Sequence, residues 1–281
     1  MRPATVDRLR RLDAELTRMR GDRERPPDAS IVIPVNAQSD LETVLTVLED
    51  IARYRGERTF EIVLVVNNYP GEDPPVESRS YAAAGMRVVS VPNVWRAGEA
   101  VCLSARVPGI RAAEAERVIL FDADCRISNP TPLLDWYVDR LGSGTHVAYT
   151  RVGHYDLRPL WSVRARVLAH HLSRTVKRVL LRFPTTRGSN YGVNRAAFLD
   201  AYEAGMLADD LNVGPALKAA GGRAVYGGSG ELEVLTSGRK FQGGWRKLAR
   251  YLRYRLLYNV RLLRGQSRRS AGKSYHQRPL R

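Results

Sequence analysis

The sequence predicts an α/β protein built on a mainly parallel β-sheet with helices on both faces. Two observations carry this prediction. Short runs rich in β-branched residues, bounded by turn residues, recur along the first half of the chain and indicate buried strands. Segments with apolar residues at helical spacing separate them, and strands that alternate with helices pair in parallel. The 281 residues suffice for a full core, so we expect one large domain with appendages.

A short charged helix is predicted within residues 1–28. Four apolar residues there are spaced by three or four positions and share one helical face: Leu9, Leu12, Leu16 and Met19. Two heptads are too few for a coiled coil, so we interpret this segment as an arm that packs on the domain rather than as a dimerisation helix.

Four buried strands follow, at residues 30–35, 61–66, 86–91 and 117–121. A helix is predicted after the first strand, with a capping box formed by Ser39 and Glu42 at its start. Another helix is predicted to begin near Ala97, between the third and fourth strands. The fourth strand runs directly into Asp122.

The second half of the chain is less regular. Residues 158–187 are basic and helical in pattern, with no acidic residue among them. A glycine-containing segment at 187–190 then leads into a helix, and the pair Asp209-Asp210 is expected to open the next one.

Polar side chains follow three of the predicted strands where each strand ends. They are Asn36 with Gln38, Asn67 with Asn68, and Asp122 with Asp124. Ligands of open parallel sheets bind at this edge, because loops and helix N-termini converge there. Two carboxylates one residue apart at a strand tip can hold a hard divalent cation, which in turn bridges phosphate oxygens. A plain acidic turn is the alternative that the spacing by itself leaves open.

Taken in order, these segments resemble the family 2 glycosyltransferases of GT-A fold. The segments SIVIPVNAQSD, EIVLVVNNYPGED and ILFDADCRIS are similar to the nucleotide-binding half, and the segment from TTRGSNYGVN to GGRAVYG is similar to the acceptor half. The resemblance covers about residues 30–228 and rests on the order and spacing of the motifs. It implies a Rossmann-like catalytic domain at 29–238, divided into halves at 29–128 and 129–238, with the arm at 1–28 and a basic helical tail at 239–281.

The resemblance implies a metal-dependent hexosyl- or N-acetylhexosaminyl-transferase that uses Mg²⁺ or Mn²⁺. Its donor would be a nucleoside-diphosphate sugar, most simply a UDP-sugar, and transfer to an acceptor hydroxyl would invert the anomeric carbon. The Gln-x-x-Arg-Trp motif of processive members is absent from the chain, which favours transfer of a single sugar. Asn67 and Asn68 stand where the family usually carries acidic residues, and this departure leaves the identity of the base open.

Individual roles follow from the same resemblance. The metal would be held by Asp124 with Asp122, the DXD motif, and Asp210 would be the base that accepts the proton of the acceptor. The donor would contact Pro34, Asn36, Asn67, Asp122 and Arg239, and the acceptor would contact Gly188, Ser189, Asn190 and Asp209. For Arg239 two interpretations stay open, a clamp on the diphosphate or merely the first residue of the tail.

Two functions of other classes remain alternatives. A nucleotidyltransferase that makes sugar nucleotides would need a glycine-rich, arginine-containing loop directly after the first strand, and residues 35–40 contain no glycine. A catalytically silent module that binds a nucleotide sugar or a membrane surface is the second, and the presence of Asp122, Asp124 and Asp210 argues against it.

The net charge of +16 is concentrated at one end of the chain. Residues 239–281 contain fourteen Lys or Arg and no acidic residue, and the rest of the chain is nearly neutral. Within this tail, residues 245–269 combine leucines four residues apart with cations on the flanks. Such a helix can lie on an anionic membrane, where a lipid-linked acceptor is one option, or pack on the enzyme itself. A nucleic-acid partner is not expected, because no base-reading motif is present.

The location follows from composition. The chain has two cysteines, too few for a disulfide framework, and its first thirty residues lack the apolar core of a secretory signal. A cytoplasmic protein is expected, with peripheral contact at the inner face of the membrane as one option.

Overall fold

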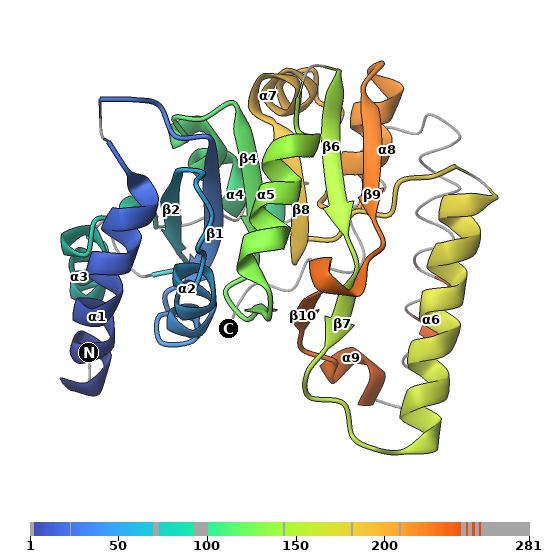
Figure 1. The fold of residues 1–281 in the computed structure, drawn as a ribbon. Coiled ribbons are helices and arrows are strands. Elements are labelled where there is room, and N and C mark those ends of the chain that lie inside the picture. The colour runs from blue at the N-terminus through green and yellow to red at the C-terminus, as the bar shows by residue number, and fades with distance from the viewer. Residues whose placement is uncertain are drawn as a thin grey trace.

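A seven-stranded mixed sheet forms the centre of the molecule (Figure 1). The computed structural model describes residues 3–22, 24–69, 73–92, 101–142, 144–180, 182–207 and 209–242, with single positions at 246, 249, 250 and 253. The strand order is β3 (Arg87–Val91), β2 (Phe60–Asn67), β1 (Ala29–Asn36), β4 (Arg117–Phe121), β8 (Asn190–Asn194), β6 (Thr145–Thr150) and β9 (Arg223–Gly227).

The first four strands of this order are parallel, and β8 is antiparallel to both of its neighbours. β1 pairs in parallel with β2 and β4, and β2 pairs in parallel with β3. The antiparallel β8 lies between β4 and β6, so that residues of the second half of the chain come to lie beside the end of β4. A small second sheet adds β5 (Arg126–Ile127), β10 (Val234–Thr236) and β7 (Val152–His154).

Helices cover both faces of the large sheet, as the sequence predicted. One buried cluster contains side chains of α1 (Pro3–Arg20), α2 (Val44–Ala52) and α5 (Pro130–Arg140). The other contains side chains of α4 (Val101–Ala112), α7 (Arg195–Glu203) and α8 (Val213–Ala219). Among the described residues, the other helices are α3 (Val76–Ala83) beside β3, α6 (Trp161–Val179), the single turn η1 (Gly230–Leu232) and α9 (Arg239–Gln242).

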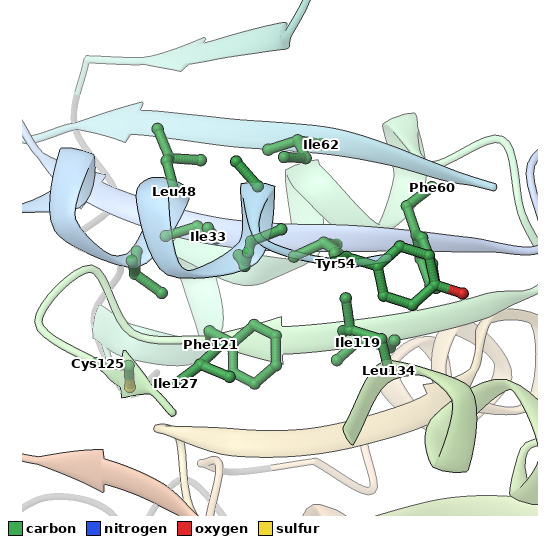
Figure 2. Close-up of a cluster of buried hydrophobic side chains, with 14 of the residues drawn as sticks. Ile33, Leu48, Tyr54, Phe60, Ile62, Ile119, Phe121, Cys125, Ile127 and Leu134 are labelled. Carbon is green, nitrogen blue, oxygen red and sulfur yellow. The ribbon is translucent and has the colours of Figure 1, made fainter. Parts of the chain in front are cut away.

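The first cluster shows why the amphipathic segments fold as they do. Leu48 of α2 lies over Ile33 of β1, with Phe121 of β4 nearby (Figure 2). The four apolar residues of α1 are also buried in this cluster, which confirms that their spacing marks a packing face. A bidentate ion pair from Arg8 of α1 to Glu49 of α2, at 2.6 and 2.7 Å, fixes the arm further.

Three local predictions need comment. The capping box is wrong, since α2 begins at Val44 and the residues before it form turns around Asn36 and Asp40. The helix predicted to open at Asp209-Asp210 begins three residues later, at Val213, because the side chain of Asp209 bonds within the preceding turn. The predicted start of a helix near Ala97 lies outside the described residues.

None of the helices in the described part of the chain combines the length and apolar character needed to cross a bilayer. The tail segment 245–269 lies almost wholly outside the described residues.

Candidate active site

A fully buried arginine lies at the centre of the predicted site. Arg106 of α4 has 0% relative exposure. Its Nη2 donates to the carboxylate of Asp122 and, at 2.7 Å, to the carbonyl oxygen of Gly188. Its Nε lies 3.0 Å from Oδ1 of Asp210. Arg106 therefore joins the end of β4, the loop before β8 and the turn before α8.

The sequence-based prediction missed Arg106. The residue lies on the face of α4 that also buries Leu103, Val107 and Ile110, and its guanidinium packs over the ring of Tyr191, 5.7 Å from the centroid. A charged residue within a run of buried apolar spacing is the signal that could have identified it, because an unpaired buried charge is strongly unfavourable.

Asp210 is held in one orientation by three contacts. Its Oδ1 accepts a hydrogen bond of 2.8 Å from the hydroxyl of Tyr191 in addition to the ion pair with Arg106. Its backbone carbonyl accepts a bond of 2.9 Å from Oγ1 of Thr186. The residue is 5% exposed. All three contacts are made to Oδ1 or to the backbone, and Oδ2 lies on the side of Gly188.

The close approach at Gly188 requires a glycine. A Cβ atom at this position would lie 2.7 Å from Oδ2 of Asp210 and 2.9 Å from Nη2 of Arg106. Both distances are shorter than real Cβ contacts, and both partners are anchored. The absence of a side chain at residue 188 is therefore what lets the loop meet the ion pair.

Asp209 has a different part in the same turn. Its Oδ1 accepts hydrogen bonds from the backbone nitrogens of Leu211 and Asn212, at 2.8 and 3.0 Å. The pair of adjacent aspartates thus divides into one residue that shapes the turn and one that faces the guanidinium of Arg106.

Asp122 and Asp124 lie where the sequence predicted, directly after β4. Burial raises the pKa of Asp122 to about 6, with Arg106 opposing the shift and the carboxylates of Asp210 and Asp124 adding to it. Burial also raises the pKa of Asp124, and Arg239 counteracts this. Crowded carboxylates of this kind favour a bound cation or proton.

Arg239 lies beside the DXD carboxylates, where a guanidinium could contact a diphosphate. Its Nη2 is 3.4 Å from Oδ2 of Asp124, and the side chain is mostly exposed. Its backbone nitrogen and Nε both contact Oγ of Ser237, at 3.3 and 3.0 Å. The side chain is therefore at the site and accessible from outside.

The two DXD carboxylates suit a divalent cation in chemistry, because they supply hard oxygen donors. Within the described ranges, no group of three or more His, Cys, Asp or Glu side chains is placed to hold a metal. A cation here would take two protein carboxylates and complete its shell with phosphate oxygens and water, as Mg²⁺ usually does.

The two asparagines at the end of β2 make different contacts. The Asn67 side chain, predicted to contact the donor, is buried, and its Nδ2 donates to the carbonyl of Val65 in its own strand. Asn68 instead adopts a positive φ of 60° and donates through Nδ2 to Oδ1 of Asn36, at 3.2 Å. The half-buried Pro34 and Asn36 share this edge.

Asn190 and Ser189 are internal. The Asn190 side chain is fully buried, accepting from the hydroxyl of Tyr137 and donating to Oγ1 of Thr150. Ser189 is buried too, and its carbonyl accepts a bond from the thiol of Cys125. Contact between the Asn190 side chain and an acceptor would require both of its bonds to break.

Comparisons with known proteins agree with this fold. No family model matches the chain, and a search of curated proteins found no match. A solved mannosyltransferase from Pyrobaculum calidifontis, in complex with GDP-Man and Mn²⁺, is 17% identical with a TM-score of 0.56, over 93% of this chain and 73% of that chain. The chain has the GT-A, Rossmann-like α/β fold.

Two further solved structures are more distant. Mannosyl-3-phosphoglycerate synthase from Rubrobacter xylanophilus is 17% identical, with a TM-score of 0.47 over 95% of this chain and 86% of that chain. Glucosyl-3-phosphoglycerate synthase from Mycobacterium tuberculosis, with Mn²⁺, UDP and glucosyl-3-phosphoglycerate, is 19% identical, with a TM-score of 0.44 over 92% and 85%.

Proposed function

We propose that the protein is a metal-dependent glycosyltransferase that moves one hexosyl or N-acetylhexosaminyl group from a nucleoside-diphosphate sugar to an acceptor hydroxyl, with inversion. The observation that carries the proposal is the Arg106 ion-pair network. It joins Asp122, at the end of a parallel strand where nucleotides bind in such sheets, to Asp210, from the half of the chain that would meet the acceptor.

The donor is proposed to bind across the ends of β1, β2 and β4. Asn36 and Asn68, together with Pro34, would contact the base and ribose, and Asn67 would support them from within β2. Arg239 would contact the diphosphate, where a guanidinium can offset charge that grows on the leaving group. UDP is the first nucleotide to test, and GDP belongs beside it because the mannosyltransferase of similar fold was solved with GDP-Man.

The metal site is proposed at Asp124, with Asp122 assisting. A bound Mg²⁺ or Mn²⁺ would supply positive charge that stabilises the departing diphosphate. The protein residues around the site have separate tasks. Arg106 sets the orientation of the Asp122 carboxylate, and Arg239 balances the charge of Asp124.

Asp210 is proposed as the general base. An acceptor hydroxyl is a weak nucleophile until its proton is removed, and a positioned carboxylate can remove it as the oxygen attacks the anomeric carbon. The C–O bond to the diphosphate breaks as the new bond forms on the opposite face, which inverts the configuration. Tyr191 and Arg106 both contact Oδ1, and we assign the proton to Oδ2, which lies on the side of Gly188.

The acceptor is proposed to approach past Gly188 and the turn at Asp209, with Ser189 shaping the loop through its backbone. A lipid-linked acceptor and contact of the tail at 245–269 with an anionic membrane are further parts of the proposal. The tail segment lies almost wholly outside the described residues.

A donor panel tests the proposal most directly. The purified protein would be incubated with UDP- and GDP-sugars, with and without Mn²⁺, and release of nucleoside diphosphate and of glycosylated products would be followed by mass spectrometry. Metal-dependent release that is lost in Asp124→Ala supports the proposal. Tight donor binding with no turnover on any acceptor would favour the silent module, and formation of a sugar nucleotide from a sugar phosphate would favour the nucleotidyltransferase.

A further inference from the structure

Helix α6 presents an apolar stripe to the outside of the molecule. Five large apolar residues repeat at intervals of seven, four, four and three positions and so lie on one helical face: Trp161, Leu168, Leu172, Val176 and Val179. All five are exposed, Trp161 by 77% and Leu168 by 69%. The opposite face buries Val163, Arg166 and His170 against the domain. The outward stripe is therefore additional to the packing face of α6.

The stripe lies at the edge of the molecule away from the arm. Figure 1 shows α6 standing beyond β9 and β7, at the opposite end of the large sheet from α1 and α3. Scattered exposed apolar residues are normal on soluble proteins, but a contiguous apolar stripe along a whole helix marks an interaction surface.

The charge around the stripe has a single sign. Residues 158–187 contain eight Lys or Arg and no Asp or Glu. On the helix, Arg164 and Arg178 fall on one flank of the stripe. An amphipathic helix with cations beside an apolar face is the arrangement that binds anionic lipid surfaces.

A basic cleft of about 590 Å³ adjoins the same helix. Four arginines line it, together with His171: Arg151, Arg164, Arg174 and Arg178. Two of these are held in place, Arg178 over the ring of Tyr226 at 3.7 Å and Arg174 by a bond of 2.8 Å to the carbonyl of Thr185. The cleft thus offers guanidinium groups of fixed direction beside the apolar stripe, which suits phosphate headgroups.

Two other occupants fit this surface less well. A second copy that packed α6 against α6 would bring the same basic flanks together, since a two-fold interface pairs a patch with itself. The tail of the same chain begins beside α6, because Nε of Arg166 donates to the carbonyl of Phe241 at 2.7 Å. Residues 239–281 are basic and contain no acidic residue, so they would repel the cations of α6 rather than neutralise them.

We propose that α6 is a docking surface for an anionic membrane. The stripe from Trp161 to Val179 would enter the boundary between headgroups and acyl chains, and the arginines of the flank and the cleft would bind lipid phosphates. This surface is distinct from the proposed tail contact and needs no sugar transfer. Because α9 packs against α6, residues 239–242 lie beside this surface.

The test uses the full-length protein and vesicles of phosphatidylglycerol mixed with phosphatidylcholine, compared with phosphatidylcholine alone. The variant is Leu168→Asp, and the matched control is Val76→Asp at the start of α3, where the replaced side chain is 72% exposed. Both substitutions add one carboxylate at an exposed apolar site. The parent and the control should sediment equally with anionic vesicles, and Leu168→Asp should bind about tenfold more weakly.

A second measurement locates the contact. In a Trp245→Phe background, which removes the tryptophan of the tail, the tryptophan emission should be quenched by brominated lipids in the anionic vesicles, and Trp161→Phe should remove most of that quenching. Equal vesicle binding by Leu168→Asp and the control would overturn the proposal, as would quenching that persists without Trp161. A parent that is dimeric and becomes monomeric in Leu168→Asp, with no vesicle binding in either, would show that a second copy covers α6.

Discussion

The guanidinium of Arg106 lies 3.0 Å from the carboxylate of Asp210, and neither group has more than marginal contact with water. The same guanidinium holds Asp122, which belongs to the opposite half of the chain. One side chain thus joins the carboxylate proposed to act at the donor to the carboxylate proposed to act on the acceptor.

Replacing Arg106 should affect stability and turnover together. Arg106→Ala leaves two carboxylates without their buried partner and should lower the free energy of unfolding by about 3–5 kcal/mol. Arg106→Lys keeps the charge but cannot hold two carboxylates and a carbonyl with one planar fork. The Arg106→Lys variant should fold with a lower free energy of unfolding, and its rate of sugar transfer should fall about a hundredfold or more. Urea unfolding and initial rates measure the two effects.

The control for Arg106 lies five residues further along α4. Arg111 pairs with Glu203, and both side chains are more than half exposed. Arg111→Ala should therefore change the free energy of unfolding by less than about 1 kcal/mol. Equal losses of unfolding free energy in the two variants would mean that any substitution in α4 destabilises the protein. That result would contradict the proposed role of Arg106.

The two adjacent aspartates should separate by variant kinetics. Asp210→Asn keeps the shape of the side chain and should preserve donor affinity, while the chemical rate falls by roughly a hundredfold or more because an amide cannot accept the proton. Asp209→Asn retains an oxygen for the backbone bonds of Leu211 and Asn212 and should have a small effect. Single-turnover rates and donor titration distinguish these cases. Loss of transfer in Asp209→Asn with an active Asp210→Asn would contradict the assignment.

Metal affinity should depend on pH through Asp122. The pKa of this carboxyl is raised to about 6, so it is charged above that value and protonated below it. Mn²⁺ binding in the absence of donor should therefore weaken as the pH falls through 6, approaching about tenfold per pH unit below it. Bound metal stabilises the charged carboxylate, so in the metal complex Asp122 becomes protonated at a lower pH. Titration calorimetry from pH 5 to 8 measures the slope, and a profile that is flat in the parent speaks against Asp122 as a ligand.

Gly188 provides a steric test of the same junction. Gly188→Ala would place a methyl group against Asp210 and Arg106 at 2.7 and 2.9 Å. It should lower the free energy of unfolding by about 1–3 kcal/mol and abolish most turnover, because neither partner can move without breaking the ion pair. Gly142→Ala is the control, since a Cβ there meets nothing within 4 Å. Thermal unfolding of both variants decides whether the effect is local.

The spacing of apolar residues predicted the strands, the helices and the sheet edge that carries Asp122 and Asp124. The contacts that complete the site join segments that are far apart in the chain. The apolar runs before Asn36, Asn67 and Asp122 predict buried parallel strands. Because such strands end at the same edge of the sheet, this edge could be predicted from the sequence. Nothing local announces that Arg106 faces Asp210, because the pair is separated by more than a hundred residues and by the antiparallel insertion of β8.

The side chain of Asn67 illustrates the other limit of sequence reasoning. Asn67 and Asn68 are the same residue type side by side, and only the backbone decides which one reaches Asn36. Asn68 does so because its φ of 60° turns the chain, a conformation that asparagine tolerates better than most residues.

The position of β8 between β4 and β6 makes the middle of the connecting segment, residues 157–180 with α6, a replaceable module. The bond from Thr186 to Asp210 and the pairing of β7 with β10 lie outside this middle part, so its chemistry can change without moving Asp122 or Asp210. Natural variation or engineering in this part would change the proposed docking surface while the carboxylate geometry stays constant. A graft of α6 onto another protein of this fold should transfer the proposed docking without the carboxylates.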